Sequence, residues 1–352
     1  LGLTTVSCNG FLDEMPDNRT ELNTDQKIAK LLVSAYADVS PNELFELYSD
    51  NSDDSGPTYG YYKLSEQECY HWQDTKEEYQ DTPNSLWGGY YSAIAAANMA
   101  LNAIEEKGNP ASLDPQRGEA LVCRAYCHFM LANIFCNAYD THASQSLGVP
   151  YMEEVETTVS PRYERGTLEE VYRKVERDLL EGIDLISDDS YSVPKYHFTR
   201  KAAYAFAARF YLYYMKPDFS NCDRVIDFAT RVLGTNPADL LRNWEALGNL
   251  SVNGNVQADA YIASSNEANL LISSTVSNWG AIGSDYLIGP RYFHNQTLAT
   301  SETCLSSGLW GSSDYFYLKP FSTNGFVASI LRKSGLYEVS LIHISEPTRL
   351  RR

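Results

Sequence analysis

A series of helix-forming patterns between residues 82 and 237 constrains the fold of this chain more than any other feature of its sequence. In each pattern, apolar residues recur every three or four positions and therefore share one face of a helix. The first begins with Thr82 as the N-cap and Pro83 in the first turn, and it ends at Gly108. The second opens at Asp114 and continues to about Tyr139. We expect these two helices to pack antiparallel because their connection is short.

Three further patterns favour a stack of paired helices. Thr167 and Glu170 form a capping box ahead of the third, and Thr199 opens an alanine-rich fourth whose small residues allow close helix approach. The fifth begins at Asn221, and residues 204–237 together are similar to one tetratricopeptide repeat. Because one such unit cannot bury both of its faces, we expect the earlier helices to stack with it. The sequence therefore predicts a mainly all-α fold.

The segments on either side of this series lack long periodic patterns. Residues 24–38 predict one amphipathic helix, after which periodicity stops until about residue 82. A long segment without regular structure in a compact domain usually serves binding. From about Ala238 the sequence is rich in Trp, Tyr, Gly, Ser and Asn, and we expect loops laid over the helical scaffold.

Charge and cysteine usage narrow the classes of partner. The formal net charge of -18 disfavours nucleic acid as a partner, because binding it needs clustered Lys and Arg. The seven cysteines include no C-x-x-C pair and no His placed to complete a zinc site, so we expect neither a metal nor another cofactor. Cys123 and Cys127 lie four positions apart on one predicted helix, where we expect free thiols.

Aromatic residues are the unusual part of the composition. The chain has 26 Tyr beside 5 Trp and 13 Phe, and this is about twice the usual share of Tyr. A Tyr ring combines a flat apolar face with one polar hydroxyl, so it can lie in a core, in a protein interface or under the apolar face of a sugar ring.

Both ends of the sequence show unusual patterns. Residues 1–7 read Leu-Gly-Leu-Thr-Thr-Val-Ser ahead of Cys8, which is typical of the end of a lipoprotein signal peptide. We therefore expect residues 1–7 to be a remnant of that signal and Cys8 to carry acyl chains that anchor the protein to a membrane. Residues 341–352 show no pattern continuous with the preceding sequence, and we expect them to be a non-native read-through tail.

Several motifs, taken in order, resemble the SusD/RagB family of outer-membrane nutrient-binding lipoproteins. The matching segments are Cys8-Asn-Gly-Phe-Leu-Asp13 with Pro16, Leu86-Trp87-Gly-Gly-Tyr90 with Ala97-Asn98, Glu119-Ala-Leu-Val-Cys-Arg124-Ala-Tyr126, Gly148-Val-Pro150, and residues 167–178 and 199–212. The resemblance covers about residues 8–237 and is weaker at 265–267. The resemblance rests on the order and spacing of these motifs along the chain, since each motif alone is common. Members of this family are usually longer, which implies that the C-terminal part is incomplete.

The resemblance implies a function and a location. It implies a tetratricopeptide-containing protein that binds oligosaccharide or polysaccharide at the cell surface, anchored to the outer membrane through Cys8. It further implies delivery of the glycan to a SusC-like TonB-dependent transporter, which the protein would cover as a hinged lid. Residues 8–237 would then form the SusD-like helical region, and residues 238–340 would form an incomplete ligand-binding region.

Two segments combine the aromatic rings and polar groups that a sugar site requires. The candidates in the first are Tyr61, Tyr62, Tyr70, Trp72 and Asp74, and those in the second are Trp279, Tyr286, Arg291 and Tyr292. Trp72 is the leading candidate, whereas we assign Trp87 and Asn98 to helix packing.

Two other classes remain open. A glycoside hydrolase also displays aromatic residues and needs only two carboxylates. The sequence has no G-x-S-x-G, H-E-x-x-H or phosphate-loop motif, so we predict no enzymatic activity and name no catalytic residue. A tetratricopeptide scaffold that binds only protein would instead confine its aromatic residues to a concave helical groove.

Overall fold

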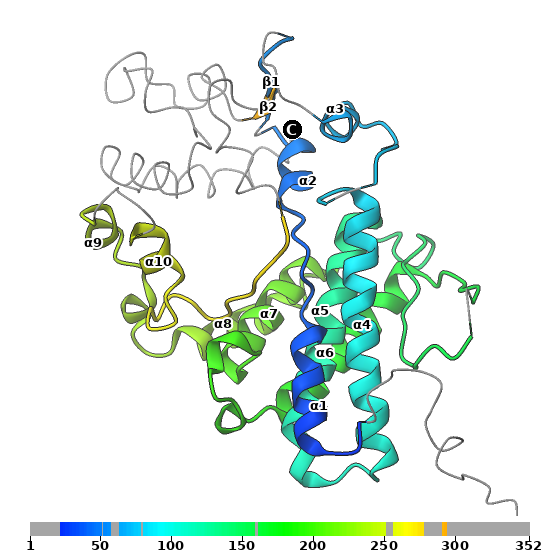
Figure 1. Ribbon diagram of the computed structural model, residues 1–352, viewed down its shortest axis with the longest axis vertical. Helices are drawn as coiled ribbons and strands as arrows, with labels where there is room; N and C mark the ends of the chain where they lie inside the picture. Colours follow the sequence, from blue (N-terminus) through cyan, green and yellow to red (C-terminus); the bar gives the residue numbers. More distant parts are fainter. Residues whose placement is uncertain are drawn as a thin grey trace, which may run out of the picture.

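The body of the protein is a stack of antiparallel helices, as the patterns predict (Figure 1). The computed structural model describes residues 22–50, 52–57, 63–78, 80–158, 161–250, 256–277 and 291–293. The helices of the body are α1 (Asp25–Leu32), α4 (Pro83–Glu106), α5 (Asp114–Phe135), α6 (Leu168–Leu185), α7 (Arg200–Tyr213) and α8 (Cys222–Leu233). The long α4 and α5 form the centre, with α1 against α4, α6 against α5, and α8 paired with α7. The mainly all-α prediction is confirmed.

Local capping fixes where most of these helices begin. The hydroxyls of Thr82, Thr167 and Thr199 each accept the backbone N–H three residues on, which satisfies a donor at the start of α4, α6 and α7. Asn221 precedes α8 but makes no such cap; its side-chain amide instead donates to the carbonyl oxygen of Tyr214. That hydrogen bond ties the start of α8 to the end of α7.

The structure also contains short helices, most of them in segments that were expected to lack regular structure; the first, η2, instead lies within the helix expected at residues 24–38. They are the 3₁₀ turn η2 (Val33–Ala35), α2 (Asn42–Leu47), α3 (Leu64–Tyr70), η3 (Ala111–Leu113), η4 (Asp188–Ser190), η5 (Pro194–Tyr196), η6 (Pro237–Leu240), α9 (Trp244–Gly248) and α10 (Val256–Ile262). Helices this short are unstable alone and form only where tertiary contacts support them, so their sequences carry little periodic signal. The second long helix also ends at Phe135, before the expected limit at Tyr139.

A close glycine contact joins α5 to α6. A Cβ added to Gly118 would lie 2.7 Å from the carbonyl oxygen of Gly182, and the reverse substitution would meet Gly118 at the same distance. The two helices therefore approach more closely than larger residues would allow. Cys123 and Cys127 are buried in α5 as free thiols, which confirms that expectation.

A buried ion pair connects the central helices. The guanidinium of Arg124 donates from Nε to Asp178 (2.6 Å) and from Nη1 to Asn98 (3.0 Å), joining α5 to α6 and α4. The hydroxyl of Tyr151 also donates to Asp178 (2.7 Å). Because the buried charges are paired and hydrogen-bonded, the network can persist in the core. Asn98 therefore has the packing role assigned to it.

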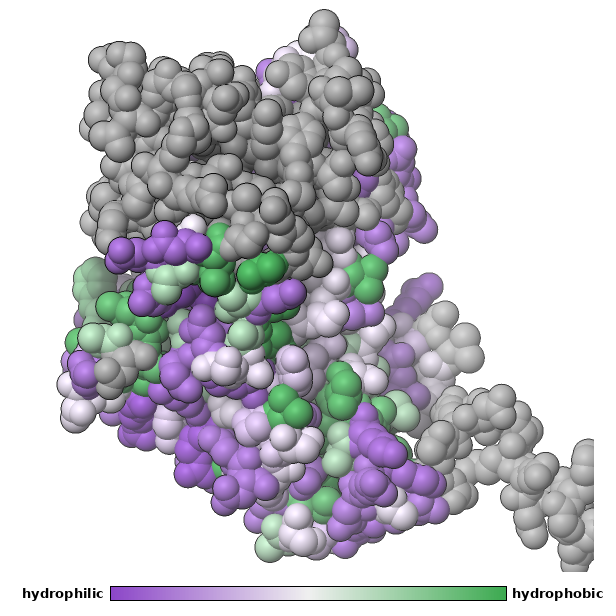
Figure 2. All heavy atoms as spheres, turned by 60° about the vertical axis from the view of Figure 1, so that its left-hand side comes forward, coloured by the Kyte–Doolittle hydropathy of each residue, from purple (hydrophilic) through white to green (hydrophobic). Residues whose placement is uncertain are grey.

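Hydrophilic residues make up most of the described surface on the face drawn in Figure 2, with apolar residues scattered among them. Within the described ranges, no helix combines the length and apolar character needed to cross a membrane. Cys8 and residues 341–352 lie outside the described residues, so the expectations for them stay predictions.

Candidate functional site

The structure brings the described parts of the two predicted aromatic segments, residues 63–78 and 291–293, together at one end of the helical body. Strand β1 (Asp53–Asp54) pairs antiparallel with β2 (Tyr292–Phe293), and both strands lie beside α2 and α3 at the upper end of Figure 1. Of the nine candidate residues, Tyr70, Trp72, Asp74, Arg291 and Tyr292 are described. The other four, Tyr61, Tyr62, Trp279 and Tyr286, fall on positions that the structure does not describe.

Trp72 follows the last turn of α3 in a conformation that normally suits glycine. Its φ is 55°, and its N–H donates to the carbonyl of Cys69 (2.9 Å) while the N–H of Gln73 donates to that of Glu68 (2.7 Å). These two bonds form a Schellman motif, in which the left-handed position is most often Gly. A bulky residue there is strained, and strain of this kind clusters at functional sites.

The side chain of Trp72 is both exposed and held in place. It is 73% exposed, and its ring stacks on that of Tyr48, which follows α2, with centroids 4.6 Å apart and an interplanar angle of 20°. Burial raises the pKa of Tyr48 to about 12, and the carboxylate of Asp74 adds to that shift. The supporting ring is therefore neutral at ordinary pH, and Trp72 presents its outer face to solvent.

An arginine clamp fixes β2 to β1. The guanidinium of Arg291 donates from Nε to Oδ1 of Asp54 (2.6 Å) and from Nη2 to Oδ2 (2.7 Å). This two-pronged geometry is the strong form of an ion pair. The hydrogen bond from Arg291 holds the pKa of Asp54 below its usual range.

Tyr292 lies in the structure as a buried support, which corrects its expected role as a ligand contact, whereas the expected role of Arg291 stays a prediction. Tyr292 is only 2% exposed and packs on the half-buried ring of Tyr70, with centroids 4.7 Å apart. A covered ring cannot offer its face to a sugar. The pair with Asp54 engages two of the five N–H donors of the Arg291 guanidinium. The sequence could not show which way Tyr292 faces, because that depends on the pairing of β2 with the distant β1.

Buried carboxyl groups lie under this end of the molecule. Glu43 of α2 and Glu66 of α3 are both buried, and each lies within 4 Å of the ammonium group of Lys63. The pKa of Glu43 is raised to about 8, mainly by burial, with Lys63 opposing the rise and Glu66 and Asp81 adding to it. At neutral pH Glu43 is therefore mostly protonated, which removes one buried negative charge from the base of the site.

Two parts of the site were missed by sequence reasoning, namely Tyr48 and Asp54. Tyr48 lies 24 positions before its stacking partner, and Asp54 lies 237 positions before Arg291. Pairs so distant in sequence have no spacing rule. The dense run of Asp, Ser and Gly after Tyr48 was the only available signal, and it indicates a turn.

The helical scaffold thus holds the exposed ring of Trp72 against the half-buried ring of Tyr48 at one end of the molecule. Within the described ranges, no three His, Cys, Asp or Glu side chains are placed to hold a metal ion.

A SusD-like family profile, described as "Starch-binding associating with outer membrane", matches residues 10–212. The chain therefore belongs to the SusD-like family.

Solved structures share the fold. A SusD superfamily protein from Bacteroides vulgatus is 20% identical with a TM-score of 0.56, over 82% of this chain and 63% of its own. A second from Bacteroides thetaiotaomicron is 19% identical with a TM-score of 0.51, over 63% and 48%. A SusD-like carbohydrate binding protein from Bacteroides vulgatus is 15% identical with a TM-score of 0.53, over 76% and 56%. The chain thus spans roughly half to two thirds of these structures. No curated protein matches the sequence.

Proposed function

We propose that this protein binds oligosaccharide or polysaccharide at the bacterial surface, with the exposed face of Trp72 as the main contact. The single observation that carries the proposal is that a strained, 73% exposed indole is stacked on Tyr48. The family description and the carbohydrate-binding neighbour support the same ligand class.

Binding at this surface would rest on apolar contact with little ordering cost. One face of a pyranose ring carries C–H groups, and this face can cover an aromatic ring and remove apolar area from water. The ring of Trp72 is already fixed by Tyr48 and by the end of α3, so little conformational freedom is lost on binding. The exposed carboxylate of Asp74 can accept hydrogen bonds from sugar hydroxyls. No covalent step is involved, and we propose no enzymatic activity.

The wider context follows from the family. We propose that Cys8 carries the lipid anchor at the outer membrane and that the protein delivers its glycan to a SusC-like TonB-dependent transporter. Within the chain, we propose that residues 8–237 form the helical scaffold and that residues 238–340 contribute further ligand contacts, with Trp279 and Tyr286 as candidates. Tyr61 and Tyr62, from the loop near Trp72, are further candidates. Co-purification of such a transporter with the membrane-anchored protein tests the partnership, and its absence from the purified material would contradict it.

Native gel electrophoresis through embedded neutral polysaccharides tests the glycan proposal. We expect the wild type to be retarded by at least one of starch, β-glucan, xylan and mannan, and Trp72→Ala to lose most of that retardation. Phe219→Ala is the matched control, because Phe219 is also exposed (65%) and left-handed (φ 57°) but lies between α7 and α8. Equal retardation of the wild type and Trp72→Ala would overturn the proposal.

The hydrolase alternative is tested with the same ligands. Prolonged incubation of the purified protein with each polysaccharide should produce no new reducing ends. Their appearance in proportion to protein concentration would place the chain among glycoside hydrolases.

A further inference from the structure

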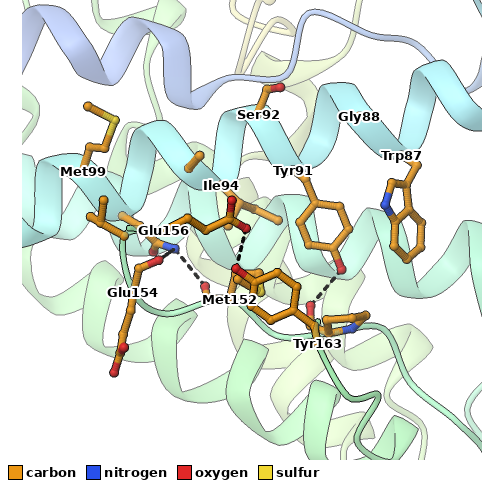
Figure 3. Close-up of a pocket in the computed structure, with 14 residues that line it drawn as sticks. Trp87, Gly88, Tyr91, Ser92, Ile94, Met99, Met152, Glu154, Glu156 and Tyr163 are labelled. Carbon is orange, nitrogen blue, oxygen red and sulfur yellow. Dashed lines mark hydrogen bonds between the residues drawn. The ribbon is translucent and has the colours of Figure 1, made fainter. Parts of the chain in front are cut away.

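A groove of about 700 Å³ runs between α4 and the loop that connects α5 to α6 (Figure 3). This volume falls within the range of small-ligand sites. Trp87 and Tyr91 project into the groove from successive turns of α4, and Tyr163 faces them from the loop. None of its lining residues belongs to the surface around Tyr48 and Trp72. Trp87 packs against Phe135 as expected of a helix-packing residue, but its side chain also lines the groove.

The aromatic rings are held by hydrogen bonds from their own hydroxyls. The hydroxyl of Tyr91 donates to the carbonyl of Pro150 (2.8 Å), and that of Tyr163 donates to Oε1 of Glu156 (2.6 Å). Both polar ends are therefore satisfied within the protein. What remains for a ligand is the apolar surface of each ring in a fixed orientation, which lowers the entropic cost of binding.

The loop side of the groove is fastened to the helical core. The side-chain amide of Asn98 donates to the carbonyls of Met152 (3.1 Å) and Glu154 (3.3 Å). The N–H of Met152 donates to Nε2 of His128 (3.0 Å), whose Nδ1 lies 2.9 Å from the carbonyl of Arg124. Because Nε2 accepts, Nδ1 carries the proton and donates. The groove is thus a built feature of the scaffold.

The polar rim of the groove determines what kind of ligand it can accept. Its charged groups are the carboxylates of Glu154 and Glu156, both exposed, and the exposed hydroxyl of Ser92 lies on the opposite wall. Carboxylates can only accept hydrogen bonds and repel anions. The ligand must therefore offer an apolar face to the rings, hydroxyl or amine donors to the rim, and no negative charge.

We propose that this groove is a second saccharide site, specific for uncharged sugar chains, and this inference rests on the proposed function. A pyranose ring meets all three requirements, since it has a C–H face, several hydroxyl donors and no charge. Two sites on one molecule would let a single long glycan engage both and bind more tightly than either site alone. A peptide rich in Lys also meets the charge requirement and is the competing occupant that the experiment must exclude.

Isothermal titration with neutral hexasaccharides of glucose, xylose and mannose separates the sites. With the ligand that binds, we expect two equivalents per wild-type molecule, and one each for Tyr163→Ala and Trp72→Ala. The affinity lost at the groove in Tyr163→Ala should be at least about tenfold. Tyr163→Phe is the matched control, because it keeps the ring and should retain the second equivalent. Tyr163 is 43% exposed on a loop, and thermal unfolding of each variant verifies the fold.

Each outcome decides between the two sites. If the wild type bound only one equivalent of hexasaccharide and Tyr163→Ala bound the same amount, the groove proposal would be overturned and the Trp72 site would stand. If Tyr163→Ala lost all binding while Trp72→Ala bound like the wild type, the groove site would be supported and the role of Trp72 refuted. No saturable binding of any hexasaccharide would overturn both. Binding of a hexalysine peptide that Tyr163→Ala abolishes, without saccharide binding, would assign the groove to a protein partner and overturn its saccharide role.

Discussion

Replacing Trp72 with Gly should separate the stability of the protein from its affinity for glycan. Most substitutions at a binding aromatic leave doubt whether lost binding reflects lost folding. Trp72 escapes this difficulty because its φ of 55° lies in the left-handed region that Gly adopts freely. A change to Gly removes the ligand contact and relieves backbone strain at the same time.

The expected change in stability is small because opposing effects nearly cancel. Relief of the left-handed conformation contributes about 1–2 kcal/mol. Loss of the stack on Tyr48 costs about 0.5–1.5 kcal/mol, and the greater freedom of Gly in the unfolded chain costs a further ~0.5–1 kcal/mol. Trp72→Gly should therefore unfold within about 1 kcal/mol of the wild type. Trp72→Ala keeps the strain and should be less stable than the Gly variant by roughly 1 kcal/mol.

The expected change in affinity is much larger. With 73% of its surface exposed, Trp72 offers one open face to a ligand. Covering roughly 75 Å² of that face at about 25 cal/mol per Å² contributes ~2 kcal/mol, or about 30-fold in Kd. Urea unfolding and titration with the hexasaccharide that binds measure the two quantities on the same preparations. Wild-type affinity in Trp72→Gly would refute the binding role, and destabilisation by more than about 2 kcal/mol would refute the strain argument.

Three further predictions concern the scaffold. Gly182→Ala should cost about 2–4 kcal/mol because its Cβ would lie 2.7 Å from the oxygen of Gly118, whereas Gly88→Ala meets nothing within 4 Å and should gain up to about 1 kcal/mol; equal urea midpoints would contradict this. Burial raises the pKa of Glu43 from 4.5 to about 8, so the folded state holds a proton that the unfolded state releases. The free energy of unfolding should therefore fall by up to about 1.4 kcal/mol per pH unit as the pH rises from 6.5 to 8. Glu43→Gln should flatten that slope. Burial lowers the pKa of His128 from 6.5 to about 3, so in the Glu43→Gln background stability should fall as pH drops from 6.5 towards 3; unfolding midpoints that stay level over that range would disprove it.

Local chemistry made the helical body predictable. Thr82, Thr167 and Thr199 predict the starts of α4, α6 and α7, and in the structure each is an N-cap. The left-handed Gly108 and Gly234 mark two of the ends. Capping and hydrophobic periodicity depend on residues within one or two turns, so a single sequence contains all the information that they use.

The surface around Trp72 could be predicted only in part. Its aromatic richness and the choice of Trp72 came from the sequence, but the roles within it did not. Tyr292 became a buried support and Arg291 a clamp on Asp54, because the pairing of β1 with β2 turns one ring inward and brings a carboxylate to the guanidinium. The groove at Tyr91 and Tyr163 was also missed, since these two residues lie 72 positions apart in the chain, one on a helix and one on a loop.

By itself, the sequence determined that this protein is a stack of capped helices, that its family is SusD-like, and that aromatic residues gather in its non-periodic segments. Only the tertiary structure decided which aromatic rings face solvent and which lie in the core. Helix formation is set by neighbours a few residues apart, whereas the exposure of a ring depends on segments brought together from up to 237 positions away.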